Sequence, residues 1–265
     1  MGIRKTSYIM GLVLLVTITT ACTHSRIPDE EWIDLFNGRD LENWVPKFTG
    51  QPLGNNYRDT FRVENGVLKV SYDNWKKFDG EFGHLIYKQP FSNYLLRLEY
   101  RFTGEQLNNG PDWAFRNNGV MLHGQTPESM SLDQRFPVSI EVQLLGGNGH
   151  DPRTTANVCS PSTHYMHEGK LVTQHCTNST SATFHGDQWV KLEVEVHGDK
   201  VIRHRVNGEL VFEYSKPQLD ESDRDAKRLL DSGAPRFLSS GYISLQAESH
   251  PTEFRHIQLL PLPAQ

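Results

Sequence analysis

The sequence predicts an all-β fold in which two large antiparallel sheets pack face to face as a jelly-roll sandwich, with one short helix. Short runs of alternating apolar and polar residues recur along the chain, separated by Gly, Asn, Asp and Pro. Two Asn-Gly pairs, Asn65-Gly66 and Asn207-Gly208, each stand between apolar runs, a strong signal for a tight hairpin. No βαβ rhythm appears, which argues against a parallel sheet.

The N-terminus has the features of a secretory signal. Arg4 and Lys5 precede an apolar run, Tyr8 to Thr17, and small residues then lead to Cys22. The run is too short for a comfortable membrane span. Cys22 resembles the lipidated first residue of a bacterial lipoprotein, whereas plain secretion would leave it an ordinary thiol.

Three segments follow from this interpretation: a signal peptide over residues 1–21, a linker over 22–32 and a single β-sandwich domain over 33–265. Thr23, which is not Asp, favours an outer-membrane lipoprotein that faces the periplasm or the cell surface. The net charge of −5 comes from interspersed charges of both signs, and no basic stripe suggests nucleic acid as a partner.

Alternation assigns two faces to the strands expected near residues 117–125, 139–147 and 241–248. The residues predicted to face the core are Val120, Leu122, Ile140, Val142, Leu144, Ile243, Leu245 and Ala247. The opposite faces carry Met121, His123, Glu141, Gln143, Tyr242, Ser244, Gln246 and Glu248. By contrast, the strand in 189–196 shows Lys and Glu outward, which is typical of a solvated surface.

The polar face can be an ordinary solvated surface or the floor of a cleft. Its short hydrogen-bonding groups, with few lysines, and the loop residues Trp75, Trp113, Phe115 and Arg116 favour a carbohydrate cleft, in which planar side chains cover sugar rings and amides or carboxylates bind hydroxyls.

The chemistry remains open between several pairings. Glu141 with His123 can supply a base and an acid. Glu141 with Glu248 instead suggests ordinary glycoside hydrolysis. Each residue also has a structural alternative: His123 can cap a carbonyl, and Glu248 can pair with Arg255.

Cys159 and Cys176 lie 17 residues apart in an exported chain, which favours a disulfide that closes a hairpin-like loop. A metal site built from Cys159, His164, His175 and Cys176 is the alternative, but no C-x-x-C spacing supports it. The one plausible helix, Asp220 to Gly233, has an acidic start and a glycine stop.

Several motifs together resemble the 3-keto-disaccharide hydrolase family. They are "LFNGRDLENWV", "GHLIYKQPFSNYLLRLEYRF", "NNGVMLHG", "SIEVQLLGG" and "GYISLQAESHPTEFRHIQLLPL", in the family's order over residues 33–262. The chain departs from the commonest form at Asn118, at His123 and in a long insertion over residues 147–180 that carries both cysteines.

The resemblance implies a concanavalin- or laminarinase-like jelly roll that cleaves glycosides previously oxidised at carbon 3 by a separate sugar dehydrogenase. It implies catalytic roles for Glu141 and His123 on the cleft face. The side chains expected to bind substrate are Gln143, Asn118, Trp113, Arg116, Gln246 and Glu248. Some members look metal-dependent, so a divalent metal ion is a candidate cofactor, and no organic cofactor is expected. A non-catalytic carbohydrate-binding lipoprotein and a conventional glycosidase remain alternatives.

Overall fold

The computed structural model describes residues 1–2 and 31–264. The chain from Glu31 onward forms one compact unit. The predicted signal peptide and the lipidation site Cys22 lie outside the described residues. No helix in the described part of the chain is long and apolar enough to cross a membrane.

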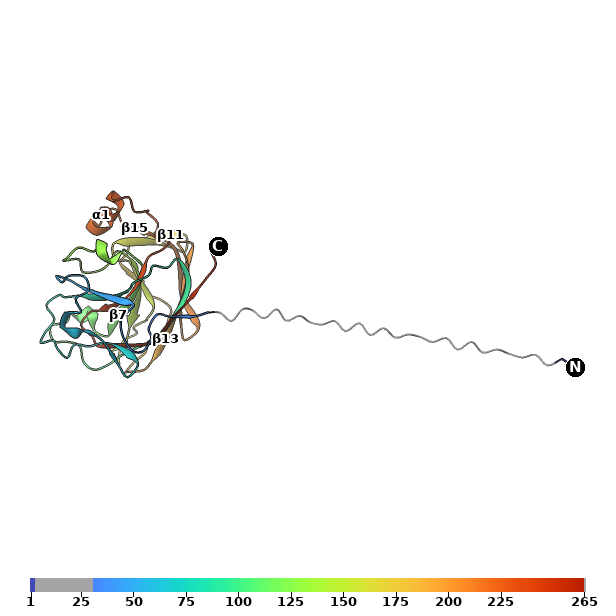
Figure 1. Cartoon of the computed structure of the whole chain (residues 1–265), viewed down its shortest axis with the longest axis horizontal. Coiled ribbons are helices and arrows are strands. Elements are labelled where there is room, and N and C mark those ends of the chain that lie inside the picture. The colour runs from blue at the N-terminus through green and yellow to red at the C-terminus, as the bar shows by residue number, and fades with distance from the viewer. Residues whose placement is uncertain (3–30, 265) are drawn as a thin grey trace. The chain divides into compact units, whose positions relative to one another are not determined.

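The described strands form two antiparallel sheets, which confirms the predicted all-β sandwich (Figure 1). The seven-stranded sheet runs in the order β12 (Cys176–Thr177), β9 (Asn157–Cys159), β8 (Ile140–Leu145), β7 (Asn117–Gly124), β16 (Tyr242–Ala247), β5 (Gly83–Tyr87), β2 (Trp44–Phe48). The ten-stranded sheet runs in the order β11 (Lys170–Val172), β10 (Thr163–His167), β15 (Glu209–Leu219), β14 (Val201–Val206), β13 (Val190–His197), β6 (Asn93–Phe102), β17 (Thr252–Pro261), β4 (Val67–Val70), β3 (Phe61–Glu64), with β1 (Ile33–Asp34) beside β17.

The core lies between the two sheets and contains the side chains that alternation assigned to it. From the seven-stranded sheet these are Val120, Leu122, Ile140, Val142, Leu144, Ile243, Leu245 and Ala247, all at most 1% exposed. From the ten-stranded sheet, β13 and β6 contribute alternate residues in the same way, for example Val194 and Leu96. The polar side chains of β8 and β16 therefore lie on the face of the smaller sheet that is turned away from the core.

Both Asn-Gly hairpins are present. Asn65 and Gly66 join β3 to β4, and Asn207 and Gly208 join β14 to β15. All four residues have positive φ, which the type I′ turn requires and which Asn and Gly adopt with least strain.

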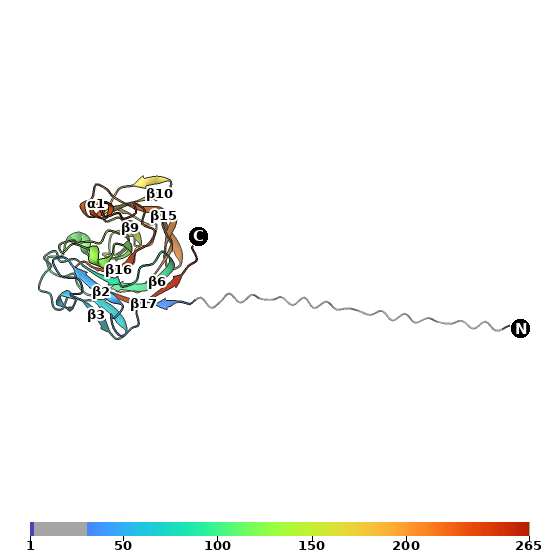
Figure 2. The same ribbon diagram turned by 45° about the horizontal axis from the view of Figure 1, so that its top comes forward.

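The predicted helix forms, but it is shorter than expected. Helix α1 (Arg224–Asp231) begins after Asp223, whose carboxylate accepts hydrogen bonds from the N–H groups of Asp225 and Ala226. The residues before it form a turn, because Asp220 accepts from the N–H of Ser222 at 2.9 Å. Figure 2 shows α1 at the margin of the sandwich near β15, where Ala226 is buried.

The insertion over residues 147–180 extends both sheets. Its strands β9 and β12 form one edge of the seven-stranded sheet, and β10 and β11 form one edge of the ten-stranded sheet. The predicted disulfide links β9 to β12, where Cys159 and Cys176 are directly paired with Cα atoms 4.1 Å apart. The cysteines are therefore not ligands of a metal site with His164 and His175.

Removing this disulfide is expected to lower the free energy of unfolding by about 3 kcal/mol, because the cross-link restricts the unfolded chain over a loop of this length. The measurement is urea unfolding of the double variant Cys159→Ser, Cys176→Ser against the oxidised protein. The oxidised protein treated with a reductant should match the double variant. Equal urea midpoints for all three samples would contradict the expectation.

Candidate functional site

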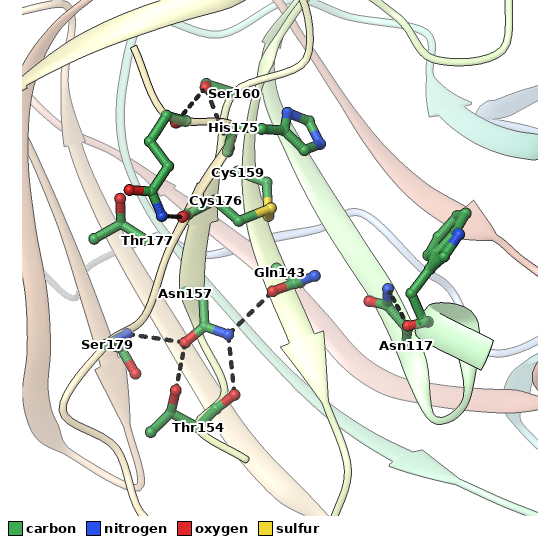
Figure 3. Close-up of a disulfide and its surroundings, with 12 residues drawn as sticks. Asn117, Gln143, Thr154, Asn157, Cys159, Ser160, His175, Cys176, Thr177 and Ser179 are labelled. Carbon is green, nitrogen blue, oxygen red and sulfur yellow. Dashed lines mark hydrogen bonds between the residues drawn. A yellow bond between two sulfur atoms is a disulfide. The ribbon is translucent and has the colours of Figure 1, made fainter. Parts of the chain in front are cut away.

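A pocket of about 370 Å³ opens on the face of the seven-stranded sheet that is turned away from the core. Strands β7 and β8 and the residue after β16 form its floor, and the insertion forms one wall. Its lining residues are Trp113, Asn117, Phe136, Glu141, Gln143, Cys159, Pro161, His175, Cys176 and Glu248. Figure 3 shows part of this pocket, with Gln143, His175 and the disulfide lying near one another.

Two carboxyl groups, Glu141 on β8 and Glu248 after β16, lie buried in the pocket floor at 6% and 2% exposure. Burial raises the pKa of Glu248 to about 8. Burial and the neighbouring charge of Glu248 raise the pKa of Glu141 well above its usual value. Because each charge disfavours the other, the pair holds at least one proton near neutral pH and combines an acid with a base.

Gly119 on β7 makes room for the side chains that meet from β8 and β16. A Cβ atom at this position would lie 2.3 Å from Glu141 Oε1 and 2.5 Å from Gln246 Oε1. Neither polar atom of the Gln246 side chain has a hydrogen-bond partner, although this residue is fully buried. Gln246 does not line the pocket itself, so it supports the floor beside Glu141.

Gln143 lies two residues beyond Glu141 on the same face of β8. Its Oε1 accepts a hydrogen bond of 3.0 Å from Nδ2 of Asn157 on β9 (Figure 3). Its Nε2 donates to no acceptor in the described part of the chain, so this donor remains for a ligand.

Aromatic rings form another part of the pocket wall. The indole of Trp113 is 53% exposed and stacks on Phe82, with centroids 5.8 Å apart and planes 14° apart. Phe136 also packs against Phe82, at 5.0 Å. Asn117 donates to the carbonyl of Trp113 at 3.2 Å and so holds this wall against β7. An exposed indole of this kind can cover the apolar face of a sugar ring.

His123 does not lie on the pocket face of β7, so the prediction that it does is wrong. Its backbone has a φ of +51°, and the pairing of β7 with β16 shifts register there, so the simple alternation of β7 ends before His123. The ring points toward the ten-stranded sheet and donates from Nε2 to the carbonyl of Gly198 at 3.1 Å. Burial lowers the pKa of His123 to about 4, so the ring is neutral at physiological pH. His123 does not line the pocket and cannot act beside Glu141.

Two of the residues expected to bind substrate also lie elsewhere. Asn118 is fully buried and donates to the carbonyl of Gln246 and to Thr252 Oγ1. Arg116 donates to the carbonyl of Gly186 and pairs with Asp187. Neither residue lines the pocket, since their polar groups are already bound to neighbouring segments.

Contacts in the structure also exclude two other possibilities that the sequence raised, an exposed Trp75 and a pairing of Glu248 with Arg255. Trp75 is buried and donates to Thr60 Oγ1, so it is not an exposed platform. Arg255 pairs with Glu99 and leaves Glu248 free for the pocket. Of the residues expected in the site, Glu141, Gln143, Trp113 and Glu248 line one pocket, and Gln246 lies beside it.

The pocket also contains residues that the sequence did not single out: Asn117, Phe136 and Pro161. His175 was considered only as a metal ligand. Alternation along β7 could have identified Asn117, because Val120 and Leu122 face the core and residue 117 has the opposite parity. No pattern in the sequence identifies Phe136 or Pro161, since both belong to loops.

A divalent metal ion does not fit the residues present. Within residues 31–264, no three His, Cys, Asp or Glu side chains come together as ligands.

Comparison with solved structures agrees with the fold. The structure of a protein from Parabacteroides distasonis ATCC 8503, described as a presumed glycosyl hydrolase, matches with a TM-score of 0.52 and 18% identity over 88% of this chain and 95% of that chain. A protein of unknown function with a galectin-like fold from Bacillus subtilis matches with a TM-score of 0.53 and 10% identity over 89% of this chain and 96% of that chain. A search of curated proteins found no match. The model of the 3-keto-alpha-glucoside-1,2-lyase-like domain matches residues 31–260, so the chain belongs to this family of carbohydrate-related proteins.

Proposed function

We propose that this protein cleaves 3-keto-glycosides by elimination at carbons 1 and 2 of the oxidised sugar. The observation that carries the proposal is the buried pair of Glu141 and Glu248 beside the free donor of Gln143 in one pocket. Membership in the family named for a 3-keto-alpha-glucoside lyase supports the substrate class. The name of the similar protein from Parabacteroides distasonis, a presumed glycosyl hydrolase, supports activity on glycosides.

The ketone makes the reaction accessible. A carbonyl at C3 acidifies the proton on C2, because the electrons left by that proton delocalise into an enolate. The enolate then expels the oxygen substituent at C1, and a double bond forms between C1 and C2. The leaving oxygen takes up a proton, so the reaction needs a base, an acid and a donor to the C3 oxygen. Addition of water to the resulting enone would complete a net hydrolysis.

The pocket offers one group for each task. Gln143 and Glu141 are same-face neighbours on β8, about 7 Å apart along the strand. The C3 oxygen and the C2 proton are likewise adjacent on the sugar, so we assign Gln143 to the C3 oxygen and Glu141 to the C2 proton. Glu248, just after β16, protonates the leaving oxygen at C1. The carboxyl pair keeps one proton near neutral pH, and this proton must lie on Glu248 when Glu141 acts as the base. Trp113 covers the sugar ring.

The deciding experiment offers the protein a glucoside and the same glucoside oxidised at C3. We expect cleavage of the ketone alone, because only it has an acidified C2 proton. In D2O, unreacted ketone should gain deuterium at C2 when proton removal is reversible, and any product formed by addition of water to the enone should carry deuterium at C2. Since a dehydrogenase must install the ketone, adding such an enzyme to the plain glucoside should restore cleavage.

Two other outcomes would each replace the proposal. Equal cleavage of the plain glucoside would show a conventional glycosidase, which a carboxyl pair such as Glu141 and Glu248 also permits. Binding of either sugar without any cleavage or exchange at C2 would show a carbohydrate-binding protein, a function suited to the exposed Trp113.

A further inference from the structure

Asn157, in the insertion, has every polar group of its side chain satisfied. Its Oδ1 accepts from the backbone N–H of Ser179 at 2.9 Å and from Thr154 Oγ1 at 2.8 Å. Its Nδ2 donates to the carbonyl of Thr154 at 3.0 Å and to Gln143 Oε1 at 3.0 Å. Figure 3 shows these bonds converging on the Asn157 amide, which is fully buried.

Backbone groups fix the direction of this amide. The N–H of Ser179 can only donate and the carbonyl of Thr154 can only accept. Rotating the Asn157 amide by half a turn would place two donors together at Ser179 and two acceptors together at Thr154. Such buried mismatches are costly, so Nδ2 must face Gln143.

The fixed Asn157 amide in turn fixes Gln143. Because Nδ2 only donates, the atom of Gln143 that meets it must be Oε1, and Nε2 must turn toward the pocket. We propose that Asn157 is a positioning residue that holds the Gln143 amide with its N–H donors toward the substrate, and that this orientation selects an acceptor-only oxygen at C3. The inference rests on the proposed function for the identity of that oxygen.

The orientation distinguishes a ketone from a hydroxyl. A ketone oxygen only accepts, so it is bound by the Nε2 donor and repelled by an amide oxygen. A hydroxyl both donates and accepts, so it tolerates either orientation. The Asn157–Gln143 pair therefore supplies selectivity for the oxidised sugar, in addition to the acidity that the ketone provides.

This selectivity depends on the insertion rather than on the strands of the pocket floor. Asn157 belongs to β9, two residues before Cys159, and Ser179 lies three residues after Cys176. The disulfide pairs these two segments and so holds the N–H of Ser179 in place for Asn157.

The test is the nearly isosteric replacement Asn157→Asp. The new carboxylate still accepts from the N–H of Ser179 and from Thr154 Oγ1, but it can no longer donate to Gln143 or to the carbonyl of Thr154. The lost bond to the Thr154 carbonyl should weaken binding of both sugars equally, so the ratio of the two affinities carries the test.

When ionised, the new carboxyl group attracts Nε2 of Gln143 and turns Oε1 to the pocket; the donors Ser179 N–H and Thr154 Oγ1 favour this ionised form, whereas burial opposes it. The affinities are therefore measured from about pH 7 to about pH 9, and the effect should grow as the pH rises. Binding of methyl glucoside and of its 3-keto derivative is measured by calorimetry in the Glu141→Gln background, which prevents turnover.

We expect Asn157→Asp to weaken binding of the 3-keto sugar about ten- to hundredfold, the loss expected for one good hydrogen bond replaced by a mismatch. Binding of methyl glucoside should change less than about threefold, well within the spread for a retained contact. The control variant Thr154→Val removes one bond to Asn157 but keeps the backbone groups, and it should leave the ratio of the two affinities unchanged. Equal weakening of both sugars by Asn157→Asp would show a merely structural role and overturn the proposal.

A second measurement needs no sugar. Solvent exchange of the Gln143 carboxamide protons, followed by NMR, should slow about tenfold or more in Asn157→Asp, because those protons would become hydrogen-bonded. Unchanged exchange would overturn the role of Asn157. If the unmutated site binds neither sugar, the proposed function fails, and the exchange measurement still decides whether Asn157 orients Gln143.

Discussion

Replacing Glu141 or Glu248 with glutamine is expected to abolish turnover of a 3-keto-glucoside and, at the same time, to stabilise the fold at alkaline pH. Loss of a positioned acid or base typically lowers the rate about a hundred- to ten-thousandfold. Both carboxyl groups are buried, and their raised pKa values mean that ionising them costs free energy in the folded protein. A glutamine has nearly the same shape and no charge, so it removes that cost.

The direction of the pH dependence follows from proton binding. Burial raises the pKa of Glu248 from 4.5 to about 8 in the folded protein. Between these values the folded protein holds a proton that the unfolded chain releases, so the free energy of unfolding falls as pH rises and levels off above the folded pKa. The variant Glu248→Gln lacks this loss. It should exceed the wild type in stability by about 2 kcal/mol or more near pH 9, and by little near pH 5.

Urea unfolding at several pH values, together with kcat/KM for the 3-keto sugar, checks both parts. Wild-type kcat/KM should rise from pH 5 toward pH 8, as the pair loses its first proton and supplies a base. His123→Ala is the contrasting variant: it loses the bond to Gly198 and should lower stability while leaving kcat/KM nearly unchanged. Retention of more than about a tenth of the activity in both glutamine variants would contradict the assigned roles.

The faces of the strands could be predicted from the sequence because alternation is a property of the strand itself. Ile140, Val142 and Leu144 fill the core, and Glu141 and Gln143 consequently share the opposite face. The same reasoning failed at His123, because a positive φ and a register shift end the alternation, and no sequence pattern marks such an irregularity.

The prediction that Asn118 binds substrate was wrong for a different reason. Alternation along β7 places residue 118 with Val120 and Leu122, toward the core, and the structure agrees. The expectation that it binds substrate came from the family motif. The motif residue is important for structure: Asn118 Oδ1 accepts from the N–H of Gly119, and its amide joins β7 to β16 and β17.

The insertion shows a further limit. Cysteine spacing predicted the disulfide, but not that the insertion would continue both sheets or form a wall of the pocket. That wall depends on pairing between segments that are distant along the chain, for example Cys159 with Glu141 on β8. Asn157 therefore could not be placed beside Gln143 from its position in the sequence.

Replacing Gly119 with alanine is expected to lower the activity without lowering the stability. The backbone of Gly119 lies outside the left-handed region, so alanine can adopt its conformation. Alanine has less conformational freedom than glycine in the unfolded chain, so it loses less entropy on folding. The new methyl group would overlap Glu141 Oε1 and Gln246 Oε1, which are the ends of flexible side chains and can move. The fold should therefore keep its melting temperature, while Glu141 leaves its position. A displacement of about 1 Å in a reacting group can cost about a hundredfold in rate, so kcat/KM should fall by about that factor.

Gly83→Ala provides the matched contrast on β5 of the same sheet. A methyl group there would lie 2.2 Å from the ring of Phe48, which is 1% exposed in the core and cannot move freely. This variant should lose about 1–3 kcal/mol of stability through overpacking, and its folded fraction should retain kcat/KM. The measurements are thermal unfolding and kcat/KM of both variants on the 3-keto sugar. If Gly119→Ala kept full activity, the close approach of Glu141 and Gln246 over Gly119 would not be needed for the reaction, and the base would have to be sought elsewhere in the pocket.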